Sequence, residues 1–327
     1  MWEEELREFY RERGLSEEDA ETAIKAVREF EEYLGSRGVS LESVSVDDVR
    51  EYVSLLISED RNSMERLVAI ARFCYLEKRH DVYIYFTSIL GGRSVLPSIS
   101  ERLAQIAGEE KRDAVFEGLE APPLGSPPEE FPKVTGLLME RLGAELDQRT
   151  CRRVLAGNHH RIPVEGFERH KKWYREAGSI DLFLKKMHEE AIAELEEYLR
   201  ENKIWYEQEI TPEVVEHVRG NQEVLSGVRV GDRIYMTKFP YAPREYLMET
   251  DPLKKRYYMC HCPLARASIL KGGSEVSPEW CYCSGGYGKL KFDVIFDRET
   301  EVEVLETVLG GDMQCRFSVK IPEEEIK

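Results

Sequence analysis

Apolar residues recur every three or four positions through the first third of the chain, which is the spacing of one face of an α-helix. Ser16 opens the clearest of these stretches, and the acids that follow it suit the positive end of a helix. The apolar face runs from Ala23 to Leu34, and Gly35 follows it. Residues 1–120 are therefore predicted to form an all-α helical bundle. Its further helices are expected near residues 46–56, 62–74, 82–90 and 98–107.

A proline-rich stretch interrupts this pattern at residues 121–130. Pro122, Pro123, Pro127 and Pro128 lie close together there. Prolines at this density cannot sustain a helix or a central strand. The stretch is therefore predicted to be a linker between two domains.

The pattern changes after the linker. Helical spacing continues at residues 131–155 and 179–198, and segments with strand character then alternate with turns. Gly310-Gly311-Asp312 supplies the turn of a predicted hairpin between the last two segments. Residues 131–327 are thus predicted to form an α+β domain with an antiparallel sheet, so the chain as a whole is assigned to the α+β class. The strand-like segments are residues 205–210, 233–238, 255–260, 289–296, 301–309 and 315–321.

The chain of 327 residues is strongly acidic, with a formal net charge of −17 at pH 7. Such a charge repels phosphate backbones and anionic membrane surfaces. No apolar run approaches the roughly 18 residues that span a bilayer. The first residues also lack the basic and apolar regions of a signal peptide. We therefore expect a cytoplasmic protein that binds neither membranes nor nucleic acids.

The first domain contains a helix, a glycine turn, the helix start Val44-Ser45-Val46-Asp47-Asp48-Val49 and a helix with an aromatic-rich end. This order resembles the SAM-like core-binding domain of tyrosine recombinases over residues 18–90. In that family the domain clasps DNA with a basic face. Residues 1–120 here carry 27 acidic and 16 basic side chains, which disfavours DNA binding. The alternative is a helical module for protein interaction or for a homodimer.

Seven cysteines are present, and five of them lie beyond residue 259. An odd number without a secretion signal argues against a disulfide framework. Cys260 and Cys262 form one Cys-x-Cys pair and Cys281 and Cys283 another, and on a strand both sulfurs of such a pair point to one face. Four thiolates that converge in this way favour zinc. Cys315 is a candidate to replace one of the four.

Two alternatives to zinc stay open at this point. Buried, reduced cysteines also serve as small hydrophobic residues, and a redox or iron–sulfur role suits the same residues. If four thiolates do hold zinc, the site carries two net negative charges. We therefore expect Arg266 or Arg316 nearby.

Within residues 280–317, Cys281 is followed by a Gly-Tyr pair and Cys315 is preceded by a Gly-Asp pair. This pattern resembles the end of the four-vinyl-reductase-type small-molecule-binding domain of aromatic-sensing transcriptional activators. The resemblance implies that both cysteines bind zinc beside a buried ligand pocket. Val304 and Thr307 stand where the family has a glutamate and a cysteine, so the other cysteines would complete an all-thiolate site. The same pattern also resembles the hydrolases of 2-amino-thiazoline-4-carboxylate.

Candidate ligand-binding residues are His159, His160, Glu207, Tyr241 and Arg266. The two histidines belong to a polar cluster in an irregular segment, and such loops often carry function. Glu207 and Tyr241 lie in aromatic-rich stretches that suit a pocket for a small aromatic or carboxylate ligand.

Two functions follow from these residues. The first is a cytoplasmic binding or sensory protein for a small organic ligand, in which zinc held by four sulfurs is structural because no position is open to water. The second is a hydrolase in which Cys260 or Cys283 is the nucleophile and His160 or Glu207 is the base.

Overall fold

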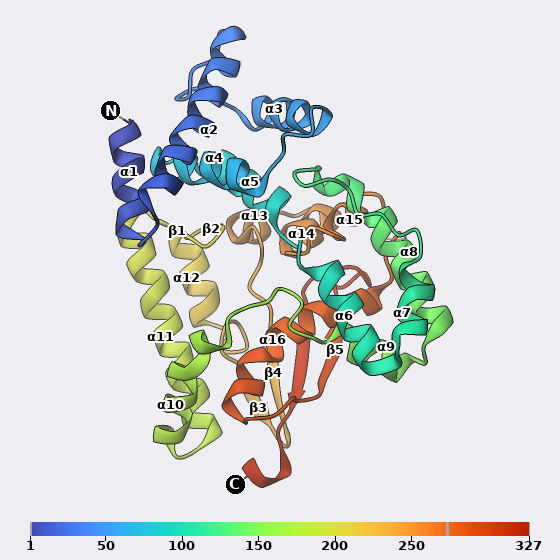
Figure 1. Ribbon diagram of the computed structural model, residues 1–327. Coiled ribbons are helices and arrows are strands. Elements are labelled where there is room, and N and C mark those ends of the chain that lie inside the picture. Colours follow the sequence, from blue (N-terminus) through green and yellow to red (C-terminus); the bar gives the residue numbers. More distant parts are fainter. Residues whose placement is uncertain (1, 273–274, 327) are drawn as a thin grey trace. The chain divides into compact units, whose positions relative to one another are not determined.

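The computed structural model describes residues 2–272 and 275–326, and it divides into two compact units (Figure 1). The first unit consists of Met1–Gly91 and Ala121–Glu130, and the second of Gly92–Glu120 and Phe131–Lys327. Helices make up the first unit, and helices with antiparallel strands make up the second. The predicted α+β class is therefore confirmed.

The first unit is a helical bundle in which serine residues cap the N-termini of three helices. Ser16, Ser45 and Ser63 each accept a hydrogen bond from a backbone N–H of the first turn that follows. Phe30 and Phe86 are fully buried in its core. The helices are α1 (Trp2–Glu12), α2 (Glu17–Ser36), α3 (Val46–Ser58), α4 (Met64–Leu76) and α5 (His80–Leu90).

Replacing Ser45 by alanine is expected to lower the free energy of unfolding of the first unit by about 1 kcal/mol. The Ser45 side chain accepts from Asp48 N, and the Asp48 carboxylate accepts from Ser45 N at 2.9 Å, so the variant loses a reciprocal cap. Urea unfolding measures the change. Ser54→Ala on the same helix is the control, because Ser54 is exposed in the helix interior and alanine is the better helix former there. Equal stability of the two variants would contradict the role of the cap.

The division between the units differs from the predicted one. Residues 121–130 do not lie apart as a linker but pack onto the first unit, where Asn62 Nδ2 donates to Leu124 O at 2.7 Å. Gly125 adopts a φ of 89° and lies so close to Val53 that a Cβ would stand 2.7 Å from its side chain. Residues 92–120 instead belong to the second unit, because apolar side chains such as Ile99 join that unit's core.

The second unit holds the remaining helices. Asp147, Ser179, Thr211 and Asp251 cap four of them. No helix in the described part of the chain is long and apolar enough to cross a membrane. The α-helices are α6 (Val95–Ala107), α7 (Glu109–Phe116), α8 (Phe131–Glu145), α9 (Gln148–Leu155), α10 (Glu168–Ala177), α11 (Ile180–Glu201), α12 (Pro212–Arg219), α13 (Pro243–Met248), α14 (Pro252–Met259), α15 (Arg266–Leu270) and α16 (Tyr282–Ile295), with short 3₁₀ turns η2 (Val164–Phe167), η3 (Pro278–Cys281) and η4 (Glu323–Glu325).

The second unit also contains a four-stranded antiparallel sheet. Figure 1 shows α16 lying across it, and Phe292 of this helix packs with Phe183 of α11 and Val319 of the sheet. The predicted hairpin is confirmed, since its two strands pair antiparallel with Val304 opposite Phe317. The strands in sheet order are β3 (Val228–Val230), β4 (Arg233–Thr237), β6 (Arg316–Lys320) and β5 (Val302–Glu306), and β1 (Ile204–Trp205) pairs separately with β2 (Gln208–Glu209).

Two predicted strands are wrong, and a third, residues 205–210, is instead part of the tight hairpin that β1 and β2 form. Residues 255–260 belong mostly to α14, which Asp251 caps by accepting from two backbone N–H groups and which Pro252 opens at its first position. Residues 289–296 belong to α16 and its C-cap. The apolar residues of that segment alternate with polar ones, but Phe292, Ile295 and Phe296 also recur at helical spacing, and packing against the sheet decides in favour of the helix.

Candidate functional site

The five C-terminal cysteines come together in the second unit. Cys260, Cys281, Cys283 and Cys315 are buried in one hydrophobic core, and Cys262 packs against it half-buried. They arrive from four places: the end of α14, the loop that follows it, the junction of η3 with α16, and the residue before β6. All five are free thiols. Residues that are up to 55 positions apart in the sequence thus share one neighbourhood.

Two of the sulfurs have polar partners. The Trp280 indole N–H donates to Cys262 Sγ at 3.1 Å, and Cys281 Sγ lies 3.0 Å from Thr307 Oγ1. Trp280 is 1 % exposed, so its indole ring is held in place by the core around it. The hydrogen bonds therefore fix the orientation of two thiols from separate segments.

The backbone of these segments differs from the expected strands. Cys260 caps the C-terminus of α14, Cys281 ends η3, and Cys283 lies in the first turn of α16. Two residues apart on a helix do not share a face. The second Cys-x-Cys pair therefore does not present both sulfurs to one point in the way that a strand would.

Burial raises the pKa of all five thiols, that of Cys260 to about 12 and that of Cys281 well above its ordinary value. Each possible pair among Cys260, Cys262, Cys281 and Cys315 also interacts electrostatically. Among the described cysteines, Cys283 interacts in this way with Cys262 alone. Four of the five thiols therefore form a mutually close set, and at neutral pH these thiols are protonated unless a cation replaces the proton.

Lys238 brings a positive charge to this set. Its backbone N–H donates to Cys315 O at 2.9 Å, and its Nζ donates to Ser284 Oγ at 2.6 Å. The ammonium group lowers the pKa of Cys260, Cys262, Cys283 and Cys315, against the larger effect of burial. No sequence pattern signals this role, because Lys238 follows β4, remote from every cysteine along the chain.

No group of three or more His, Cys, Asp or Glu side chains within residues 2–272 and 275–326 is arranged to hold a metal ion. The thiols are neighbours, but their sulfurs do not converge on one point. Zinc binding at these residues therefore requires some of the side chains to rotate toward the ion.

Arg266 and Tyr241, two of the predicted ligand-binding residues, are in direct contact. The Arg266 guanidinium carbon lies 4.1 Å from the centre of the Tyr241 ring and 4.8 Å from that of the Tyr257 ring. Arg266 and Tyr241 are buried, and the guanidinium also interacts electrostatically with Cys260. Of the two arginines expected beside the cysteines, Arg266 interacts with Cys260. Arg316 pairs with Glu223 through two hydrogen bonds of 2.7 Å.

The other three predicted ligand-binding residues lie in different settings. His159 is buried, with ring nitrogens 2.8 Å from Val154 O and 3.1 Å from Ser98 Oγ, so both are occupied by the protein. Burial also lowers its pKa to about 4, which makes it a neutral structural residue. His160 is exposed with its ring against Tyr287. Glu207 interacts electrostatically with Tyr241 and Tyr287.

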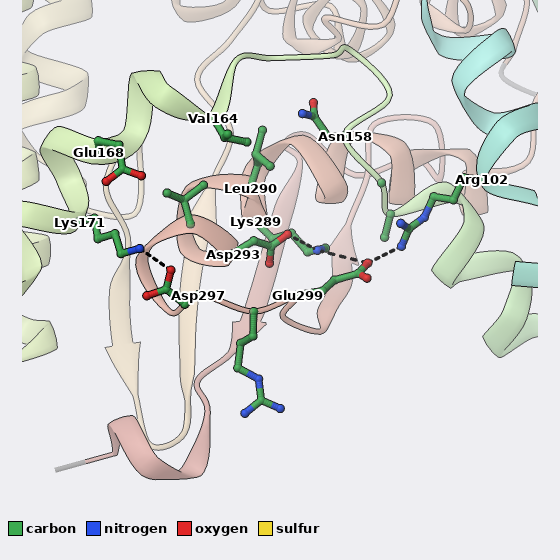
Figure 2. A pocket seen from close by; sticks show the side chains of 14 residues that line it. Arg102, Asn158, Val164, Glu168, Lys171, Lys289, Leu290, Asp293, Asp297 and Glu299 are labelled. Carbon is green, nitrogen blue, oxygen red and sulfur yellow. Dashed lines mark hydrogen bonds and ion pairs between the residues drawn. The ribbon is translucent and has the colours of Figure 1, made fainter. Parts of the chain in front are cut away.

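A separate pocket of about 460 Å³ lies between α16, α10 and the segment after α9 (Figure 2). Its charges neutralise one another: Lys171 pairs with Asp297, and Lys289 lies 2.5 Å from Asp293 and 3.7 Å from Glu299. Asn158, which precedes His159 in the sequence, also lines this pocket. Its side chain donates to Ile162 O and accepts from Ile162 N. We therefore assign the pocket no ligand.

Comparisons with known proteins bear on the same C-terminal residues. A family of unknown function, DUF6144, matches residues 242–327. The match spans about a quarter of the chain and contains all five clustered cysteines and Arg266. No curated protein and no solved structure gave a match. The resemblances to the four-vinyl-reductase-type domain, to the thiazoline-carboxylate hydrolases and to the recombinase domain stay predictions.

Proposed function

We propose that the second unit is a cytoplasmic small-molecule-binding or sensory domain whose C-terminal segments are held together by one structural zinc ion. The observation that carries this proposal is the meeting of buried thiols from α14, the loop after it, η3 and the start of β6 in one core. Thiolate is the preferred soft ligand of zinc inside cells. The resemblance to the four-vinyl-reductase-type domain points in the same direction.

The ligands of the proposed site are Cys260, Cys262, Cys281 and Cys315. Trp280 and Thr307 already contact two of these sulfurs, as outer hydrogen-bonding groups do around metal thiolates. Cys283 is left out, because it is the second residue of α16 and interacts electrostatically with Cys262 alone among the other four.

Zinc binding is compatible with the burial of these thiols. Burial raises the pKa of each, so a metal ion that binds here must displace the protons, and its charge then balances that of the thiolates. The ammonium of Lys238 offsets part of the remaining negative charge. Four sulfurs leave no position for water or substrate, so the metal is structural and not catalytic.

The hydrolase alternative has less support. A nucleophilic cysteine needs a depressed pKa or an adjacent base, but burial raises the pKa of Cys260 and Cys283. Among the described residues, no hydrogen bond joins either thiol to His160. DNA binding by the first unit also has less support, because its surface is acidic.

Metal analysis of single cysteine variants tests this proposal. Protein purified without added zinc is expected to hold one zinc ion per chain, and Cys315→Ser is expected to lose most of it. Cys283→Ser is expected to keep it. Cys151→Ser is the matched control, since Cys151 is buried in the same core but interacts with Glu279 and Arg152 and not with the other cysteines. Zinc-free wild-type protein with full thermal stability would rule the site out.

A further inference from the structure

Arg266 carries a buried charge that forms no ion pair with a carboxylate among the described residues. The residue is 7 % exposed, at the first position of α15. No ion pair joins it to a carboxylate in the described part of the chain, and its Nε has no hydrogen-bond partner. Removing a guanidinium from water costs several kcal/mol unless a counter-ion or hydrogen bonds replace the water. The unpartnered Nε leaves a buried donor to which an acceptor from outside the described residues can bind.

The Tyr241 hydroxyl has the same deficiency. It is buried and makes no hydrogen bond of ordinary geometry, although the guanidinium stacked on its ring lies near enough to interact with it. Five buried side-chain polar atoms in the described residues lack a partner, and two of the five belong to this contacting pair. Unsatisfied buried polar groups are few in folded proteins. Two of them side by side indicate one missing acceptor.

The surroundings define what this acceptor is. Tyr241 and Tyr257 place aromatic rings against the guanidinium, and the His261 ring meets Tyr241 edge-on with its Nε2 2.7 Å from Phe239 O. The guanidinium offers the paired donors that match a carboxylate, and the phenol offers one more. The aromatic rings beside the guanidinium favour a ligand whose carboxylate is attached to a flat apolar group.

We propose that Arg266 and Tyr241 form the binding site for a small organic carboxylate, whose two oxygens accept from the guanidinium while one also accepts from the phenol. This inference rests on the proposed function in that it names the ligand class of that domain, but it does not require zinc. The competing explanation is that Arg266 neutralises the Cys260 thiolate of the metal centre.

Benzoate is the probe, because it joins a carboxylate to a flat apolar ring. Isothermal titration is expected to show benzoate binding to the purified full-length protein, and inorganic sulfate is expected to bind more weakly. Arg266→Gln is expected to weaken benzoate binding at least tenfold, which corresponds to about 1.4 kcal/mol. Tyr241→Phe removes one donor while keeping the ring, and a threefold to tenfold loss is expected. Arg244→Gln, which removes an exposed arginine of the same unit, is the control and is expected to bind normally.

The zinc content of each variant separates the explanations. If Arg266→Gln loses benzoate binding but keeps its zinc, the carboxylate site is supported. If the wild-type protein holds no zinc and still binds benzoate through Arg266, the carboxylate site is supported and the zinc proposal is contradicted. Three results overturn it: no benzoate binding by the wild type, binding that is indifferent to both substitutions, or sulfate binding in preference to benzoate. If Arg266→Gln loses both zinc and benzoate binding, the carboxylate site is overturned as well, and Arg266 instead neutralises the Cys260 thiolate of the metal centre. Tyr241→Phe decides the matter if Arg266→Gln does not fold.

Discussion

Withdrawal of the proposed zinc ion with a high-affinity chelator is expected to unfold the second unit. The thiols that meet in its core belong to segments that are otherwise joined mainly by apolar packing and by the contacts of Trp280 and Thr307. Structural zinc sites contribute an apparent 10–16 kcal/mol to folding at neutral pH, on the order of the whole stability of a domain. Without the ion, the buried thiols keep their raised pKa and stay protonated, but the ties between the segments are gone.

Differential scanning calorimetry measures this effect, because the two compact units are expected to melt separately. The chelator should abolish the transition of the second unit or lower its midpoint by tens of degrees, at about 2–4 °C for each kcal/mol in a domain of this size. The transition of the first unit should stay in place, since its one cysteine, Cys74, lies in its own core. Readdition of zinc should restore the profile. Unchanged melting after complete removal of the ion would contradict the structural role.

Replacing Gly286 by alanine is expected to cost the second unit about 3 kcal/mol, at the upper end of overpacking effects. A Cβ at this position would stand 2.6 Å from Ala156 C and 2.6 Å from Gly157 O. These are backbone atoms, so α16 must move away from the segment after α9 instead of a side chain turning aside. This movement would also shift Tyr282 and Cys283 in the first turn of the helix.

Gly288→Ala is the matched control for this substitution. Gly288 lies in the same helix, but its Cβ would meet only Met236 Cε, at an ordinary distance of 3.6 Å. Alanine is the better helix former by about 1 kcal/mol, so Gly288→Ala should be neutral or stabilising. Urea unfolding of the two variants gives the comparison. A Gly286→Ala variant as stable as Gly288→Ala would show that the close approach of α16 does not constrain the fold.

Most of the fold prediction relied on helical periodicity. This signal failed where the apolar residues fit the spacing of both a helix and a strand. The stretch from Ala23 to Leu34 has a single apolar face, and it forms the expected helix. Residues 289–296 alternate like a strand and also match a helix, so only the tertiary packing of Phe292 against the sheet distinguishes the two. Prolines at 122–128 predicted a linker, but Leu124 and Gly125 find partners in the first unit that no local pattern announces.

The meeting of the C-terminal cysteines could be predicted from the sequence, but their geometry could not. Their spacing predicted that they come together, and the structure places them in one core. The spacing did not indicate that Cys283 would be set on a helix apart from the other four. The contact of Lys238 with Cys315 could not be found either, since it arises only through the folding of distant segments. Tyr241 and Arg266 were both expected at a ligand site, but no local pattern showed that they touch each other.

The interleaved division of the chain has a consequence for how the protein is made. Residues 92–120 emerge from the ribosome between two pieces of the first unit, and their apolar side chains, such as Val95 and Leu103, belong to a core that is finished only when β6 has been synthesised. Until then these helices are exposed to chaperones and proteases. A fragment that begins at residue 131 would lack them permanently, so expression of the cysteine-bearing region on its own should start at Gly92 and bypass 121–130 with a short spacer.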